Sequence, residues 1–150
     1  MHLFVGNPGV GKSTLINSIV QKAVCKGGVS IKGGLTKTLK KYVDEKTGQV
    51  YMDTPGLDDA ERREHAAEEI TQALKEDGQY KIFFVLTVEA GRIRPGDLKT
   101  MELITGSCKD ITKYHIIYNK LSEIVKKKLM ANRETLDTYD RRLGNVWFQI

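Results

Sequence analysis

The sequence has few cysteines and no long apolar segment, and each shortage excludes a class of protein. Its two cysteines, Cys25 and Cys108, stand far apart and lack the spacing of a metal site. This argues against a disulfide scaffold and favours a reducing compartment, so we expect a cytoplasmic protein. No apolar run reaches the roughly 18 residues that a membrane span needs, so we expect no transmembrane segment. The apolar start of the chain stops at Gly6 without a basic region, which is not the pattern of a signal peptide.

Histidine, a common metal ligand and catalytic base, is also sparse. The three histidines are dispersed without metal-type spacing, so we expect no metal centre and no catalytic role at His2, His65 or His115. Cys25 falls at the end of a predicted helix, where a structural role is favoured over a reactive one. Any chemistry must therefore come from other residues.

The basic character of the chain has two interpretations. The net charge is +5, and part of the excess lies in Lys126–Lys128 and in Arg141–Arg142. Basic runs of this kind occur on nucleic-acid or anionic-lipid surfaces, and also on solvated helix faces. Because no aromatic residues interleave with them, we favour the solvated face and expect no nucleic-acid partner.

The alternation of apolar patterns along the chain predicts an α/β fold. Short apolar runs predict strands at residues 3–5, 38–44, 49–53, 81–88, 114–118 and 146–150. Apolar residues at helical spacing mark helices over residues 13–23, 66–74, 95–104 and 121–129, and the second of these is expected to begin near Asp58. Residues 26–37 are rich in glycine and predict a loop, and residues 45–48 predict a hairpin turn. We therefore expect a three-layer fold with a mostly parallel sheet and one antiparallel edge hairpin.

Residues 6–13 (GNPGVGKS) match the pattern G-x-x-x-x-G-K-[ST] at every fixed position. Glycines let backbone N–H groups turn toward an anion, and the positive end of the following helix points to the same place. In such a loop we expect Lys12 to reach the β- and γ-phosphates and Ser13 to ligate magnesium. The alternative is an unoccupied glycine turn. The expected nucleotide-binding residues are Gly6, Asn7, Pro8, Gly9, Val10, Gly11, Lys12, Ser13 and Thr14.

A second segment, DTPG at residues 53–56, follows that loop by about forty positions. Asp53 ends a predicted strand, where its carboxylate could hold the metal directly or through water. Gly56 could offer its backbone N–H to a γ-phosphate. Thr36 or Thr38, at the end of the glycine-rich loop, could complete the magnesium shell, or both could simply begin a strand; we favour Thr36 as the ligand.

Together these segments resemble the translation-factor-related class of P-loop GTPases. Within it they are most similar to the septin-related branch, which includes the immunity-associated and chloroplast-import receptor GTPases. The resemblance covers residues 3–120 and is carried by GNPGVGKSTLINSI, GGLTKTLKKY, DTPGLDDAERREHAAEEITQAL and IFFVLTVEAGRIRPGDLKTMELI. It implies a six-stranded sheet between helices and GTP bound with magnesium. It also implies that Asn119 and Lys120, after the strand that ends at Tyr118, read the guanine base.

The chain departs from this family in three places. Ser122 replaces the aspartate of Asn-Lys-x-Asp, which weakens the expected discrimination against ATP. Leu57 stands where Ras-like switches place the glutamine that orients the attacking water, so slow hydrolysis is expected. The last base-contacting loop would follow Ile150, and we expect residues 1–150 to be a single G domain that lacks its C-terminal end.

The resemblance also implies GTP-dependent homodimerisation through the nucleotide face. A partner could then supply an arginine that stabilises the charge of the transition state. The alternative, which we favour for any one of them, is a solvated surface arginine. The candidates are Arg62, Arg63, Arg92 and Arg94.

Three functional hypotheses follow. The leading one is a GTP-binding switch in which Lys12, Thr36 and Gly56 act on the γ-phosphate while Ser13, Thr36 and Asp53 hold magnesium. The second is a nucleotide-dependent assembly module with little hydrolysis, which Leu57 favours. The third is a P-loop ATPase, which Ser122 suggests and the DTPG turn opposes.

Overall fold

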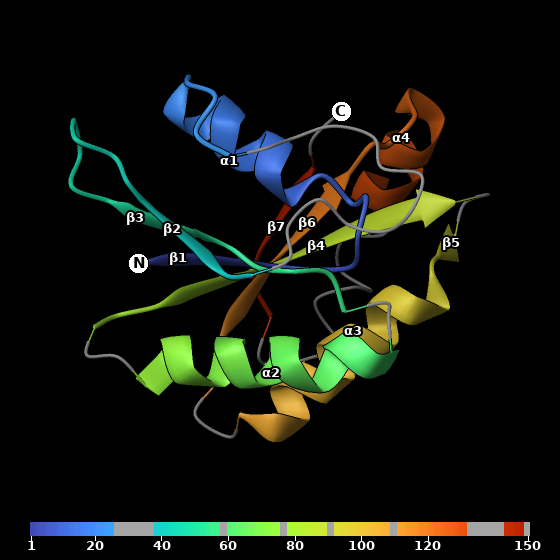
Figure 1. The fold of residues 1–150 in the computed structure, drawn as a ribbon. Helices are drawn as coiled ribbons and strands as arrows, with labels where there is room; N and C mark the ends of the chain where they lie inside the picture. Colours follow the sequence, from blue (N-terminus) through green and yellow to red (C-terminus); the bar gives the residue numbers. More distant parts are fainter. Residues whose placement is uncertain are drawn as a thin grey trace.

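The computed structural model describes residues 1–25, 38–57, 60–75, 78–89, 92–108, 111–131 and 143–148. Strands and helices alternate along this part of the chain (Figure 1). The strands are β1 (His2–Val5), β2 (Lys40–Val43), β3 (Val50–Asp53), β4 (Lys81–Glu89), β5 (Arg92–Ile93), β6 (Tyr114–Asn119) and β7 (Leu143–Phe148). The helices are α1 (Lys12–Val20), α2 (Ala60–Lys75), α3 (Pro95–Ser107) and α4 (Glu123–Ala131).

The strands form a sheet in the order β2-β3-β1-β4-β6-β7. β1 pairs in parallel with β3 and β4, and β6 pairs in parallel with β4 and β7. β2 runs antiparallel to β3, and the turn between them is closed by the Thr47 hydroxyl, which donates to the Asp44 carboxylate at 2.6 Å. The predicted α/β fold, with its mostly parallel sheet and antiparallel edge hairpin, is confirmed.

The sheet is covered on both faces. Successive residues of a strand point to opposite sides, so Leu3 and Val5 of β1 enter one core cluster while Phe4 enters the other. α1 lies on the Phe4 side, and α2 and α3 lie on the opposite side (Figure 1). Helix residues complete both clusters by packing into them, among them Leu15 and Ile16 of α1, Ile70 of α2 and Ile104 of α3.

This arrangement places the functional segments at one edge of the sheet. β1 ends at Val5, directly before the glycine-rich loop. β3 ends at Asp53, the first residue of DTPG, and β6 ends at Asn119, directly before Lys120. All three strands are parallel, so these ends lie at the same edge. Open α/β sheets bind ligands outside the carboxyl ends of their parallel strands. Among the described residues, no helix has both the length and the apolar character needed to cross a membrane.

Two boundaries of the predicted helices were wrong because single residues adopt left-handed backbone conformations. α1 ends at Val20 instead of Ala23, since Gln21 has φ 53° and caps the helix. Ile19, expected on the apolar face, is 48% exposed. α4 begins at Glu123, because Lys120 has φ 58° and turns the chain before the helix starts.

The other differences concern the ends of elements and one short strand. α2 begins at Ala60, close to the start expected near Asp58, whereas β7 begins at Leu143 instead of residue 146. β5 was not predicted, because two residues carry no periodicity. It forms a hairpin with the end of β4, in which Glu89 pairs with Arg92 and Val88 with Ile93.

Candidate nucleotide-binding site

The glycine-rich loop, Gly6 to Gly11, connects β1 to α1 and opens directly onto the first turn of that helix. Gly9 and Gly11 have φ 80° and 97°, the left-handed region that side chains rarely adopt. Gly6 is packed so closely that a Cβ would collide with the Val85 carbonyl. The fixed glycines of the sequence pattern are thus required by the conformation of the loop.

Lys12 lies inside this loop. Its ammonium group donates hydrogen bonds to the Gly6 carbonyl at 2.7 Å and to the Asn7 carbonyl at 3.2 Å, and the residue is only 6% exposed. Burial lowers the pKa of Lys12 to about 8, although Asp53 and Asp97 nearby raise it. A buried cation at the start of a helix, with few compensating charges, is electrostatically prepared for a polyanion.

Asp53 and Ser13 provide the oxygen atoms of a possible metal site. The Ser13 hydroxyl donates to the Asp53 carboxylate at 2.5 Å, and Asp53 is 1% exposed at the end of β3. Thr54 fixes the following turn, because its buried hydroxyl donates to the Phe4 carbonyl at 2.8 Å. A carboxylate and a hydroxyl side by side are hard donors that fit Mg²⁺, which prefers oxygen ligands and retains several waters.

Three threonines were predicted near this region, and two of them, Thr14 and Thr38, are described. Thr36, the expected third magnesium ligand, lies outside the described residues. Thr38 is described and exposed, and Thr14, after Ser13, is also exposed. The structure therefore brings together Ser13 and Asp53 of the predicted metal set.

The DTPG turn packs directly against the glycine-rich loop. A Cβ on Gly56 would collide with the ring of Pro8, so only glycine fits at this contact. The next residue, Leu57, is fully buried in the core cluster that includes Ile70 of α2. Leu57 is therefore a core residue and does not present its side chain to a nucleotide.

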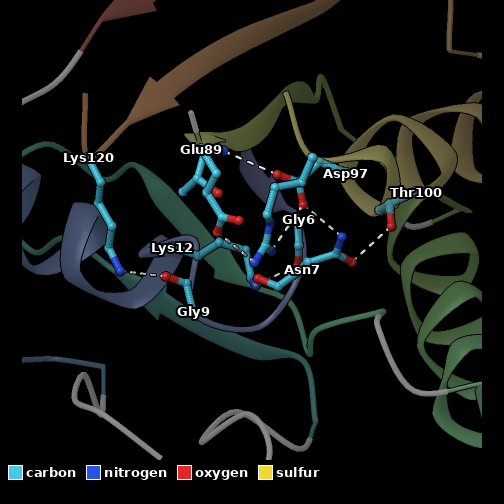
Figure 2. Close-up of polar contacts among 10 residues, drawn as sticks. Gly6, Asn7, Gly9, Lys12, Glu89, Asp97, Thr100 and Lys120 are labelled. Carbon is cyan, nitrogen blue, oxygen red and sulfur yellow. Dashed lines mark hydrogen bonds and ion pairs between the residues drawn. The ribbon is translucent and has the colours of Figure 1, made fainter. Parts of the chain in front are cut away.

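Asn119 and Lys120 reach the glycine-rich loop from the end of β6. The Asn119 amide donates to the Val10 carbonyl at 2.8 Å. The Lys120 ammonium donates to the Gly9 carbonyl at 2.7 Å (Figure 2). A Cβ on Gly11 would collide with the Asn119 amide, so the loop and this pair fit closely. The structure brings these segments into contact, and their joint role in binding a nucleotide stays a prediction.

The segment around the start of α3 also contacts the loop or its neighbours, and two of its residues, Asp97 and Thr100, had no predicted role in the site. Asp97 accepts a hydrogen bond from the Asn7 amide, and Thr100 donates one to the Asn7 side-chain oxygen. Arg94 pairs with both Asp97 and Glu89. Aspartate is common in the first turn of a helix, so no local signal in the sequence marked Asp97 as a partner of the loop.

The candidate arginines whose side chains are described differ in their contacts and exposure. Arg94 is engaged within the chain, and Arg92 on β5 is exposed. The side chains of Arg62 and Arg63 lie outside the described residues.

A glycine-rich loop follows the first strand, and an Asn-Lys pair forms hydrogen bonds with it. This arrangement is that of the P-loop GTPases. A family profile described as "50S ribosome-binding GTPase" matches residues 2–120, and the chain belongs to this family. Similar curated proteins include GTPase Era of Clostridioides difficile, 31% identical over 91% of this chain and 44% of its own length. Another is the probable GTP-binding protein EngB of Mycoplasmopsis pulmonis, 30% identical over 89% of this chain and 73% of its own.

The chain thus spans less than half the length of the Era protein it matches. Solved structures with the same fold include Toc33 from Arabidopsis thaliana in complex with GDP and Mg²⁺, with a TM-score of 0.64 and 21% identity over 97% of this chain and 69% of Toc33. A dimerization-deficient arginine-to-alanine mutant of Toc33 gives a TM-score of 0.68 at 20% identity, over the same shares of the two chains. At these identities the likeness concerns the fold alone.

Proposed function

We propose that this chain is a GTP-binding switch that uses Mg²⁺ and hydrolyses GTP slowly. The observation that carries the proposal is the meeting of Gly6–Ser13, Asp53–Gly56 and Asn119–Lys120 at one edge of the sheet. Membership of the GTPase family supports the choice of guanine nucleotide. The site residues proposed to bind it are Gly6, Asn7, Pro8, Gly9, Val10, Gly11, Lys12, Ser13, Thr14, Asp53, Gly56, Asn119 and Lys120.

In this proposal each group has one task during hydrolysis. Water attacks the γ-phosphorus, the bond to the β–γ bridging oxygen breaks, and GDP and phosphate are released. Lys12 and the loop N–H groups stabilise the charge on the phosphates, and Gly56 contacts the γ-phosphate through its N–H. Ser13, Asp53 and Thr36 would hold Mg²⁺, which when bound neutralises charge on the β- and γ-phosphates.

Slow hydrolysis is proposed because Leu57 is a buried core residue. It cannot orient an attacking water, so a faster rate would require a group from a partner. Dimerization is described as important for the GTPase activity of the chloroplast translocon components Toc33 and Toc159, which share this fold. Together with the sequence resemblance, this supports placing the chain in the septin-related branch and a homodimer that forms through the nucleotide face.

Of the two candidate arginines whose side chains are described, Arg92 is the better placed to act across such a dimer, because it is exposed on β5 while Arg94 is engaged within the chain. We expect Arg92→Ala to lower the concentration-dependent GTP hydrolysis rate at least about tenfold and to leave GDP affinity unchanged. Single-turnover hydrolysis at several protein concentrations measures this. The control is Lys81→Ala, which removes an exposed cation at the opposite end of β4. A rate that is independent of concentration in both proteins would contradict the dimer.

A nucleotide-dependent assembly module is the second candidate, and the burial of Leu57 favours it. Size-exclusion runs with GDP and with a non-hydrolysable GTP analogue separate the two. Assembly without turnover supports the module, whereas turnover without a change in elution volume supports a monomeric switch. For either function we propose a single GTPase domain in the cytoplasm.

Ser122 provides a direct test of base recognition. It is exposed before α4, and its hydroxyl accepts a hydrogen bond from the Val125 N–H at 3.4 Å. Aspartate is an equally good residue at a helix start. We expect Ser122→Asp to increase the preference for GDP over ADP at least about tenfold, because a carboxylate accepts hydrogen bonds from guanine more strongly. Competition binding measures the ratio. The control, Thr112→Asp, adds the same charge before β6 and should leave the ratio unchanged.

A further inference from the structure

The side chain of Asn7, the second residue of the glycine-rich loop, is held at both of its polar atoms by α3. Its amide nitrogen donates to Asp97 Oδ1 at 2.7 Å, and its oxygen accepts from Thr100 Oγ1 at 2.9 Å (Figure 2). Asn7 and Asp97 are each 1% exposed, and Thr100 is 5% exposed. Because both the nitrogen and the oxygen of the Asn7 amide form hydrogen bonds in a buried site, the amide is held in one orientation.

Asp97 is itself fixed from several sides. Besides Asn7, its carboxylate accepts the Thr87 backbone N–H at 3.2 Å and the Arg94 guanidinium at 3.4 Å. Arg94, which lies between β5 and α3, in turn pairs with Glu89, so β4 and the residue before α3 both provide partners for this carboxylate. Buried carboxylates are costly unless they are hydrogen-bonded and paired, and this one meets both conditions.

The network reaches the nucleotide site through the backbone of Asn7. Its carbonyl accepts a hydrogen bond from Lys12, and its neighbour Pro8 packs against Gly56. A residue before proline is restricted to extended conformations, so fixing the Asn7 side chain also fixes the direction of this part of the loop. Asp97 and Thr100 thereby influence the lysine and the turn that would meet the phosphates, without belonging to either motif.

We propose that Asp97 and Thr100 are positioning residues that act through Asn7 to hold the glycine-rich loop in its phosphate-binding conformation before nucleotide arrives. The proposal rests on the proposed nucleotide-binding function. A preformed loop avoids the cost of ordering backbone on binding, so the network raises nucleotide affinity. The competing explanation is that these bonds only stabilise the packing of α3 against the sheet.

Matched threonine variants on α3 distinguish the two explanations. Thr100→Val keeps the volume and removes the hydroxyl, while Thr100→Ser keeps the hydroxyl. The control Thr105→Val removes a hydroxyl on the same helix that donates to the Met101 carbonyl at 2.8 Å. We expect the Kd for fluorescent GDP to rise about five- to tenfold in Thr100→Val, the loss expected for one buried hydrogen bond, and to stay near the wild-type value in the other two.

A double-mutant cycle tests whether Thr100 acts through Asn7. Asn7→Ala should weaken GDP binding, and adding Thr100→Val to it should have little further effect. Urea unfolding of each nucleotide-free protein measures stability separately, and affinity should follow the hydroxyl of residue 100 and not the unfolding free energy. Equal affinity of wild type and Thr100→Val, or additive losses in the cycle, would overturn the positioning role. Failure of the wild-type protein to bind GDP or ADP would instead refute the proposed function.

Discussion

Replacing Lys12 with methionine is expected to weaken nucleotide binding strongly while leaving the fold intact. Lys12 is buried in the loop, and its ammonium would form charge-assisted hydrogen bonds with the phosphates. Loss of such bonds should raise the Kd for GDP and GTP about a hundredfold or more, and hydrolysis should fall with it. Fluorescent-nucleotide titration and single-turnover hydrolysis measure the two effects.

The same variant separates a binding defect from a folding defect. Burial lowers the pKa of Lys12 to about 8, which shows that its charged form is disfavoured in the folded protein. Methionine, an apolar side chain of similar length, removes this penalty but also leaves the Gly6 and Asn7 carbonyls without the Lys12 hydrogen bonds, so we expect the free energy of unfolding of the nucleotide-free protein to stay within about 2 kcal/mol of wild type. Lys113→Met, which replaces an exposed lysine before β6, is the control. A Lys12→Met protein that binds GDP within a few-fold of wild type would refute the assignment of the loop.

Gly56→Ala is expected to produce the second-largest effect. The new Cβ would collide with the ring of Pro8, so the DTPG turn and the glycine-rich loop would have to separate. Overpacking of this kind costs about 1–3 kcal/mol, so we expect GTP affinity and the hydrolysis rate to fall by about five- to 150-fold. The same titration and hydrolysis assays measure the result.

Gly106→Ala is the matched control for that substitution. Gly106 lies in α3, and a Cβ there would meet no atom within 4 Å. Alanine should stabilise this helix position by up to about 1 kcal/mol and leave nucleotide binding unchanged. Equal behaviour of the two glycine variants would contradict the idea that the Gly56–Pro8 contact couples the turn to the loop.

The sequence allowed the meeting of the glycine-rich loop, the DTPG turn and Asn119 to be predicted, because its signals are local. The spacing of Gly6, Gly11 and Lys12 reflects backbone geometry that a phosphate-binding loop requires. Asp53 and Asn119 each end a strong apolar run, and parallel strands bring their carboxyl ends to one edge. The residues that carry the motifs were therefore located without knowledge of the tertiary structure.

Asp97 and Thr100 could not be predicted in the same way. They contact Asn7 from 90 and 93 positions away, and nothing near them in the sequence marks the contact. The helix boundaries that were wrong depend on single left-handed residues, Gln21 and Lys120, which are neither glycine nor asparagine. Long-range side-chain contacts and unusual backbone conformations arise from packing, and hydrophobic periodicity does not record them.

The most direct test of the central claim is a competition titration against fluorescent GDP, with GDP, GTP, ADP and ATP as competitors and Mg²⁺ present. Asn119 and Lys120, the proposed guanine-reading pair, donate hydrogen bonds to the glycine-rich loop, and the chain belongs to a GTPase family. We predict that guanine nucleotides bind at least about a hundredfold more tightly than adenine nucleotides, a difference of about 2.7 kcal/mol. Equal competition by adenine nucleotides would contradict the proposed GTP switch and would indicate a nucleotide site without guanine selectivity.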